Sequence, residues 1–297
     1  MNKKEISHEM RSLQLFICNE LERIDGKATF QQDQWERAEG GGGYTNTINN
    51  GDLIEKGGVA FSEVYGPVSD VMRKQLGLNG NEFFATGVSI VLHPSNPHVP
   101  IIHMNVRYFE LDSGEYWFGG GIDLTPHYVI PENAVVFHQR LKSICDQYNA
   151  EFYDKFKKWA DEYFYIPHRQ ETRGIGGIFY DHLDEKVGLS KTELLQFALE
   201  LGRSFPFIYE EQAQFGREKE VNSSQLAWRN LRRGRYVEFN LVNDRGTKFG
   251  LLSGGRTESI LMSLPPLANW EYNLKIEPDS LEYKTLEYLK THQNWLG

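Results

Sequence analysis

The sequence predicts an α+β protein, a single domain over residues 1–297 with a large, mainly antiparallel β-sheet flanked by α-helices on both faces. Several segments rich in β-branched and aromatic residues are separated by turn-forming residues, which is typical of strands. Other segments repeat apolar residues at helical spacing. Strands and helices do not alternate regularly, which disfavours a parallel sheet. No linker, repeat or charge block marks a domain boundary.

The predicted strands cover residues 59–65, 83–92, 101–111 and 116–118. The turn cluster at 94–97 (PSNP) separates the second from the third. Residues 236–242 and 247–252 are rich in apolar residues and flank the turn NDRG at 243–246, so the sequence predicts a β-hairpin there.

Three segments predict helices. The first helix carries an apolar stripe and ends at Gly26; its stripe comprises Met10, Leu13, Ile17 and Leu21. From Glu132 to Tyr163 the apolar residues recur every three or four positions, which predicts one long helix. Ser190 and Glu193 form a capping box that begins another helix.

Composition excludes several classes of protein. The chain has 32 Lys and Arg against 41 Asp and Glu, a net charge of −9, so we expect no nucleic-acid partner. No segment has the roughly 18 uninterrupted apolar residues of a membrane span. Two cysteines cannot form a disulfide framework, and the first residues have neither the apolar run nor the cleavage site of a signal peptide, so we expect none. We therefore expect a cytoplasmic protein.

Polar side chains alternate along two predicted strands. His103, Asn105 and Arg107 share one face of their strand, about 7 Å apart. The same parity places Ser89 and His93 together on the preceding strand. If the two strands pair, one face of the sheet is polar. It is either a solvated outer face or a recognition surface, and the pattern alone leaves both interpretations open.

Four histidines are candidate ligands of a divalent metal, because imidazole is a common transition-metal ligand. They are His93, His103, His138 and His168. Their spacing matches no compact metal motif. His138 shares a helix face with apolar residues, so a structural role is the alternative for it.

The glycine clusters at 40–43, 119–121, 174–177 and 254–255 match no phosphate-binding motif, so nucleotide binding is not expected. We expect them to let the backbone approach a ligand or adopt positive φ. Arg256 after Gly254 and Gly255 could clamp a carboxylate. The arginines between 229 and 235 are interpreted as structural ion pairs or carboxylate clamps.

Three long stretches resemble the oxygen-dependent coproporphyrinogen III oxidases of haem biosynthesis. They are WFGGGIDLTPHY (117–128), KKWADEYFYIPHRQETRGIGGIFYD (157–181) and LRRGRYVEFNLVNDRGTKFGLLSGGRTESILMSLPP (231–266), with HMNVRYF (103–109) in addition. The resemblance implies oxidative decarboxylation of two propionates of coproporphyrinogen III to vinyl groups, giving protoporphyrinogen IX. It implies dioxygen as co-substrate, no organic cofactor, and a homodimer in which residues 236–271 are the dimer element.

The resemblance also assigns residues. Ser89, Asn105 and Arg107 correspond to substrate contacts, as do Gly254, Gly255 and Arg256, and His103 corresponds to the proton donor. The four histidines correspond to a site proposed for a divalent metal such as manganese. This chain has Asp181 followed by His182 where the family usually has two acidic residues.

The proposed substrate carries four carboxylates and four pyrrole N–H groups, which require cations, a carboxylate and apolar walls. We expect the catalytic carboxylate to be Asp181, with Asp123 as the alternative. Two other classes stay open at this point: an iron oxygenase with histidine ligands, and a tetrapyrrole carrier without catalytic activity.

Overall fold

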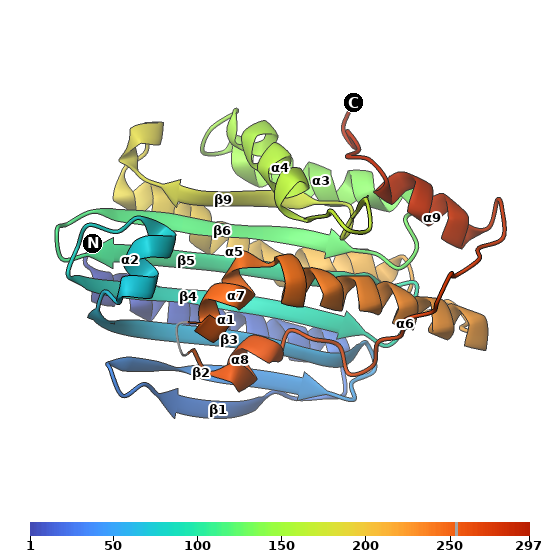
Figure 1. Cartoon of the computed structure of the whole chain (residues 1–297), viewed down its shortest axis with the longest axis horizontal. Helices are drawn as coiled ribbons and strands as arrows, with labels where there is room; N and C mark the ends of the chain where they lie inside the picture. The colour runs from blue at the N-terminus through green and yellow to red at the C-terminus, as the bar shows by residue number, and fades with distance from the viewer. Residues whose placement is uncertain (253–254) are drawn as a thin grey trace.

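The computed structural model describes residues 1–252 and 255–297, and its centre is a seven-stranded antiparallel sheet. The strand order is β1-β2-β3-β4-β5-β6-β9 (Figure 1). The strands are β1 (Gln31–Glu36), β2 (Gly41–Asn49), β3 (Ile54–Pro67), β4 (Glu82–Pro94), β5 (Ile101–Leu111), β6 (Tyr116–Thr125) and β9 (Gly177–Leu183). The predicted fold class is confirmed, as are all four segments that we predicted as strands before residue 120.

The back face of the sheet packs on α1 (Lys3–Asp25) and α5 (Lys191–Gln214), which lie behind the strands in Figure 1. Both helices begin with the capping box that their sequences encode, Asn2 with Glu5 and Ser190 with Glu193. Gly26 ends α1 with φ 81°, as predicted. The largest core cluster joins these helices to the back face.

The front face is covered by α2 (Asp70–Leu76), α6 (Ser223–Glu238), the π-helical turn η2 (Phe239–Asn243), α7 (Arg245–Leu252) and α8 (Thr257–Leu261), as Figure 1 shows. At one edge lie α3 (Pro131–Asp146) and α4 (Phe152–Tyr163), with α4 packed on β9. The remaining elements are β7 (Tyr165–Ile166), β8 (Glu171–Thr172), η1 (Glu185–Val187) and α9 (Leu281–Leu289).

The predicted hairpin over residues 236–252 is wrong, because α6 continues through this region into η2 and α7. The helical period was hidden because arginines occupy part of the buried stripe of α6. Arg229, Arg232 and Arg233 are at most 6% exposed, and they stand at helical spacing from the buried Tyr236 and Phe239. An apolar pattern cannot reveal a helix whose buried side is charged and paired.

The single long helix predicted over residues 132–163 is two helices. α3 ends at Asp146 and α4 begins at Phe152. Between them the Asn149 side chain accepts a hydrogen bond from the Glu151 N–H at 2.9 Å, a local turn that competes with helix continuation. The apolar period continues across this break, which is why the sequence concealed it.

Within the described ranges, no helix is long and apolar enough to span a membrane.

Candidate functional site

The polar side chains of β4 and β5 lie together on the front face of the sheet. Ser89 pairs in register with Asn105, and His103 pairs with Asp123 of β6. Arg107 stands between Gly87 and Gly119 on the same face. The shared face predicted from strand alternation is therefore confirmed, and we call Ser89, His103, Asn105, Arg107, Asp123 and Asp181 the polar face.

His103 is held by a buried carboxylate. Its Nδ1 lies 2.8 Å from Asp123 Oδ1, and Arg173 Nη2 donates to both Asp123 oxygens at 2.7 Å. Burial alone would raise the pKa of Asp123, but Arg173 and His103 lower it below its ordinary value. An ionised Asp123 can only accept, so His103 Nδ1 carries the proton and Nε2 is left for other partners. The His103 side chain is 24% exposed.

The Arg107 guanidinium joins two other residues of the polar face. Nη1 donates to Asn105 Oδ1 at 2.7 Å, and Nη2 pairs with Asp181 Oδ2 at 3.0 Å. Gly119 leaves room for this pair, because a Cβ there would lie 2.7 Å from Asp181 Oδ1 and 2.8 Å from Arg107 Cζ. Both charged side chains are partly exposed, so their outer atoms can meet a ligand.

Aromatic rings border the polar face. The Arg173 guanidinium lies 4.3 to 4.7 Å from the ring centroids of Phe164, Tyr236 and Phe239. Tyr163 stacks on Phe179 of β9 with centroids 4.4 Å apart. Rings and fixed charges together suit a large flat ligand with anionic groups.

Arg256 lies at the β1 edge of the sheet, opposite the edge formed by β9. Its Nη2 pairs with Asp33 of β1, and Nη1 donates to Ser259 Oγ at 3.3 Å. Ser259 Oγ lies 2.8 Å from Thr45 Oγ1 of β2. Gly255 is exposed and its N–H donates to the Gly250 carbonyl. Gly254 lies outside the described residues.

The four candidate metal ligands do not form a common site, so a metal bound by this set does not fit the structure. His93 is buried beside Ser263 and Tyr236, and His138 bonds Tyr153 and the Ile175 carbonyl. His168 pairs with Glu238 at 2.9 Å. In the described part of the chain, no group of three or more His, Cys, Asp or Glu is placed to hold a metal.

Burial lowers the pKa of His93 and of His138 to about 3. The sequence grouped these residues by type, whereas the fold distributes them among β4, β5, α3 and the β7–β8 connection.

The arginines of α6 form structural ion pairs, one of the two roles that we predicted for them. Arg229 and Arg233 pair with Glu55, and Arg232 and Arg235 with Glu171. These pairs join α6 to β3, which contains Glu55, and to β8, which contains Glu171.

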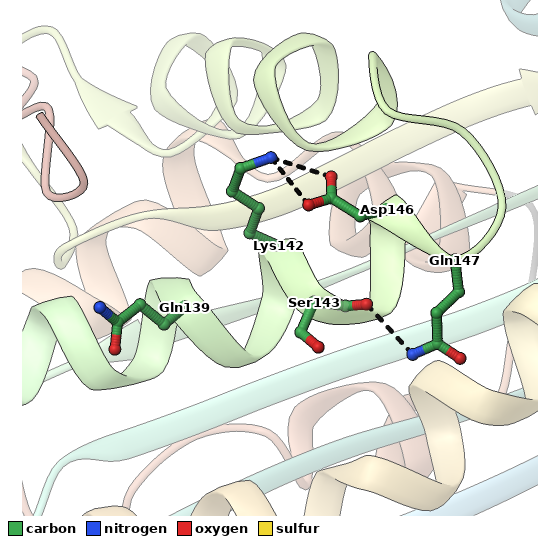
Figure 2. Close-up of a pocket in the computed structure, with 5 residues that line it drawn as sticks. All are labelled: Gln139, Lys142, Ser143, Asp146 and Gln147. Carbon is green, nitrogen blue, oxygen red and sulfur yellow. Dashed lines mark hydrogen bonds and ion pairs between the residues drawn. The ribbon is translucent and has the colours of Figure 1, made fainter.

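A surface hollow of about 410 Å³ lies elsewhere, on α3 (Figure 2). Lys142 pairs there with Asp146 at 2.9 Å, and the Gln147 side chain donates to the Ser143 carbonyl at 3.1 Å. None of the predicted site residues lines it.

Two charged groups beside the polar face were not named as site residues. Arg173 is one, since its sequence context gives no sign that it is buried against Asp123. Asp244 is the other. It accepts hydrogen bonds from the Tyr163 hydroxyl at 2.6 Å and the Thr247 N–H at 2.7 Å. The predicted hairpin places Asp244 in its turn, which gives no sign of this role.

Residues 5–295 match the family described as Coproporphyrinogen III oxidase. The chain belongs to this family. It is 46% identical over 294 residues to the human protein named "Oxygen-dependent coproporphyrinogen-III oxidase, mitochondrial". The alignment covers 94% of this chain and 64% of the human protein, so the chain spans less than two thirds of that relative's length. Membership of the coproporphyrinogen III oxidase family confirms the resemblance that the sequence predicts.

Proposed function

We propose that this chain catalyses the oxygen-dependent decarboxylation of two propionates of coproporphyrinogen III to vinyl groups, yielding protoporphyrinogen IX. Each propionic acid side chain loses carbon dioxide and two hydrogens, and the two electrons reduce one dioxygen to hydrogen peroxide. Dioxygen is the co-substrate. The observation that carries the proposal is the polar face, which combines the Arg107–Asp181 pair with a partly exposed His103 in a chain of this family.

Four carboxylates on the substrate require cationic partners. Arg107 and Arg256 are the proposed clamps, with Ser89, Asn105 and the backbone at Gly254 and Gly255 as further contacts. A guanidinium can bind a carboxylate through two parallel hydrogen bonds. Both arginines are partly exposed, and each already pairs with a protein carboxylate. The substrate carboxylate would add to or replace that partner.

Asp181 is the proposed catalytic carboxylate. Its side chain is 28% exposed, whereas both oxygens of Asp123 bond Arg173 and the side chain is 2% exposed. Asp181 can therefore reach a pyrrole N–H. By helping to remove that proton it makes the pyrrole electron-rich enough for dioxygen to attack. His103, oriented by Asp123, relays protons through Nε2.

The same arrangement does not support an iron oxygenase, because the histidines do not converge. We propose no step through manganese or another metal. Treating the protein with a strong chelator tests this point. Full retained activity is expected, and loss of activity that only added metal restores would contradict it.

We also propose a homodimer formed through residues 236–271. In this segment Leu241, Val242, Leu251 and Leu252 are 42 to 67% exposed, which is unusual for neighbouring leucine and valine side chains on a monomer. Sedimentation equilibrium of the wild type and of Leu252→Lys tests the proposal. We expect the wild type to be a dimer and the lysine of Leu252→Lys to dissociate it into monomers.

The cytoplasmic location stays a prediction from the sequence, and cell fractionation would test it.

The activity is tested by mixing protein with coproporphyrinogen under anaerobic conditions and then admitting air. We expect the release of two molecules of carbon dioxide per macrocycle and, after oxidation, protoporphyrin fluorescence. Tight binding without oxygen consumption would indicate a carrier instead.

A further inference from the structure

Strand β9 contains one extra residue directly beside the polar face. Gly120 of β6 pairs with Tyr180, and Phe118 pairs with Leu183. Between these pairs, Asp181 and His182 both lie opposite Gly119. This is the geometry of a β-bulge, in which two residues on one strand face one residue on its neighbour.

The bulge changes which face each side chain meets. In a regular strand Asp181 and Leu183 would share a face. Here Asp181 lies on the front and pairs with Arg107, whereas Leu183 is 3% exposed within the core of the back face. The extra residue therefore allows Asp181 to lie on the polar face and Leu183 to lie in the core of the back face.

His182 is the residue whose backbone makes this possible. Its φ is 49°, in the left-handed region that side chains other than glycine seldom adopt. In this conformation its N–H donates to Asp181 Oδ1 at 3.0 Å. The other Asp181 oxygen, Oδ2, pairs with Arg107. The carboxylate is thus held from both sides.

The His182 ring supports the same conformation. It stacks on Trp117 of β6 with centroids 4.6 Å apart and an interplanar angle of 29°. Trp117 in turn stacks on Phe109 of β5 at 4.5 Å. Packing on fixed rings offsets part of the cost of the backbone geometry.

We propose that His182 is a positioning residue that sets Asp181 against Arg107 through its left-handed bulge conformation. This inference rests on the proposed function of Asp181. It predicts that the position of the Asp181 carboxylate depends more on the backbone conformation at residue 182 than on the imidazole ring, because the hydrogen bond to Asp181 comes from the backbone N–H.

The test compares two substitutions at position 182 with one matched control. Asn tolerates positive φ, whereas a β-branched Val does not. We expect His182→Val to lower kcat with coproporphyrinogen about tenfold while KM changes by less than about threefold, and His182→Asn to stay within about twofold of wild type in both constants. Gln170→Val is the control, since Gln170 also has a positive φ of 55° but lies between β7 and β8. It should lower the melting temperature about as much as His182→Val without changing kcat.

An unchanged kcat in His182→Val overturns the proposal, and so does an equal fall in kcat in Gln170→Val. Should the wild type show no turnover, the proposed function fails instead. The positioning role is then decided by a crystal structure of His182→Val. Asp181 displaced from Arg107 supports it, and a retained separation near 3.0 Å between Arg107 Nη2 and Asp181 Oδ2 contradicts it.

Discussion

The two faces of the seven-stranded sheet are built from opposite residue types on the same strands. On β5 the buried Ile102, Met104 and Val106 point to the back, where α1 and α5 cover them. Between them His103, Asn105 and Arg107 point to the front and stay partly exposed. The back face therefore stabilises the fold by burying apolar side chains, and the front face of the same strands can carry charged and polar side chains.

The largest effect that this comparison predicts is on turnover, at Asp181 on the front face. Asp181→Asn should lower kcat by about 100-fold or more while KM changes by less than about threefold, because the proton acceptor is lost. Steady-state assays measure both constants. Asp184→Asn, which changes a carboxylate three residues further along the chain, is the control. Equal kcat values for Asp181→Asn and wild type would remove Asp181 from the chemistry.

A second prediction concerns the buried end of the polar face, where stability depends on a charge pair. Arg173→Met leaves Asp123 buried with His103 as its remaining partner, so we expect a loss of about 3–5 kcal/mol in the free energy of unfolding. Urea denaturation measures this loss. Arg169 is more exposed, so Arg169→Met should lower the free energy of unfolding by about 1 kcal/mol or less. A loss in Arg173→Met no larger than in this control would show that the Arg173–Asp123 pair does not stabilise the fold.

The smallest expected effect lies outside both faces, at Glu238 on α6. Burial alone would raise its pKa, but hydrogen bonds from Arg169, His168 and Trp270 lower it from 4.5 to about 2. A carboxyl whose pKa is lower in the folded state stabilises above its unfolded value and loses that contribution as pH falls. Glu238→Gln should therefore be less stable than wild type at neutral pH, by about 1 kcal/mol after solvent screening.

That gap should close as pH falls from about 4.5 to about 2, the interval between the unfolded and folded pKa values. Thermal melts over this range measure it. A gap that stays constant with pH would show that Glu238 acts through packing and not through its charge.

The sequence predicted the back face well because its signal is local. Apolar periodicity and a terminal glycine are enough to place α1, and one capping box places the start of α5. Alternation along β4 and β5 likewise predicted which polar side chains share the front face, and the register confirms this.

The cover of the front face could not be predicted in this way. Its helix α6 buries arginines whose partners, Glu55 and Glu171, lie far away in the chain. The same limitation explains why Arg173 was missed and why four histidines appeared to form a set. Pairing over long sequence distances decides these features, and a single sequence does not show it.

The most direct test of the central claim uses two neighbours on β5, Met104→Ala and Asn105→Ala. For each variant both the free energy of unfolding and KM for coproporphyrinogen are measured. The account predicts that Met104→Ala loses about 2–5 kcal/mol of stability with KM nearly unchanged. It predicts that Asn105→Ala raises KM several-fold with little loss of stability. If both variants change both quantities to the same extent, the division of labour between the two faces is wrong.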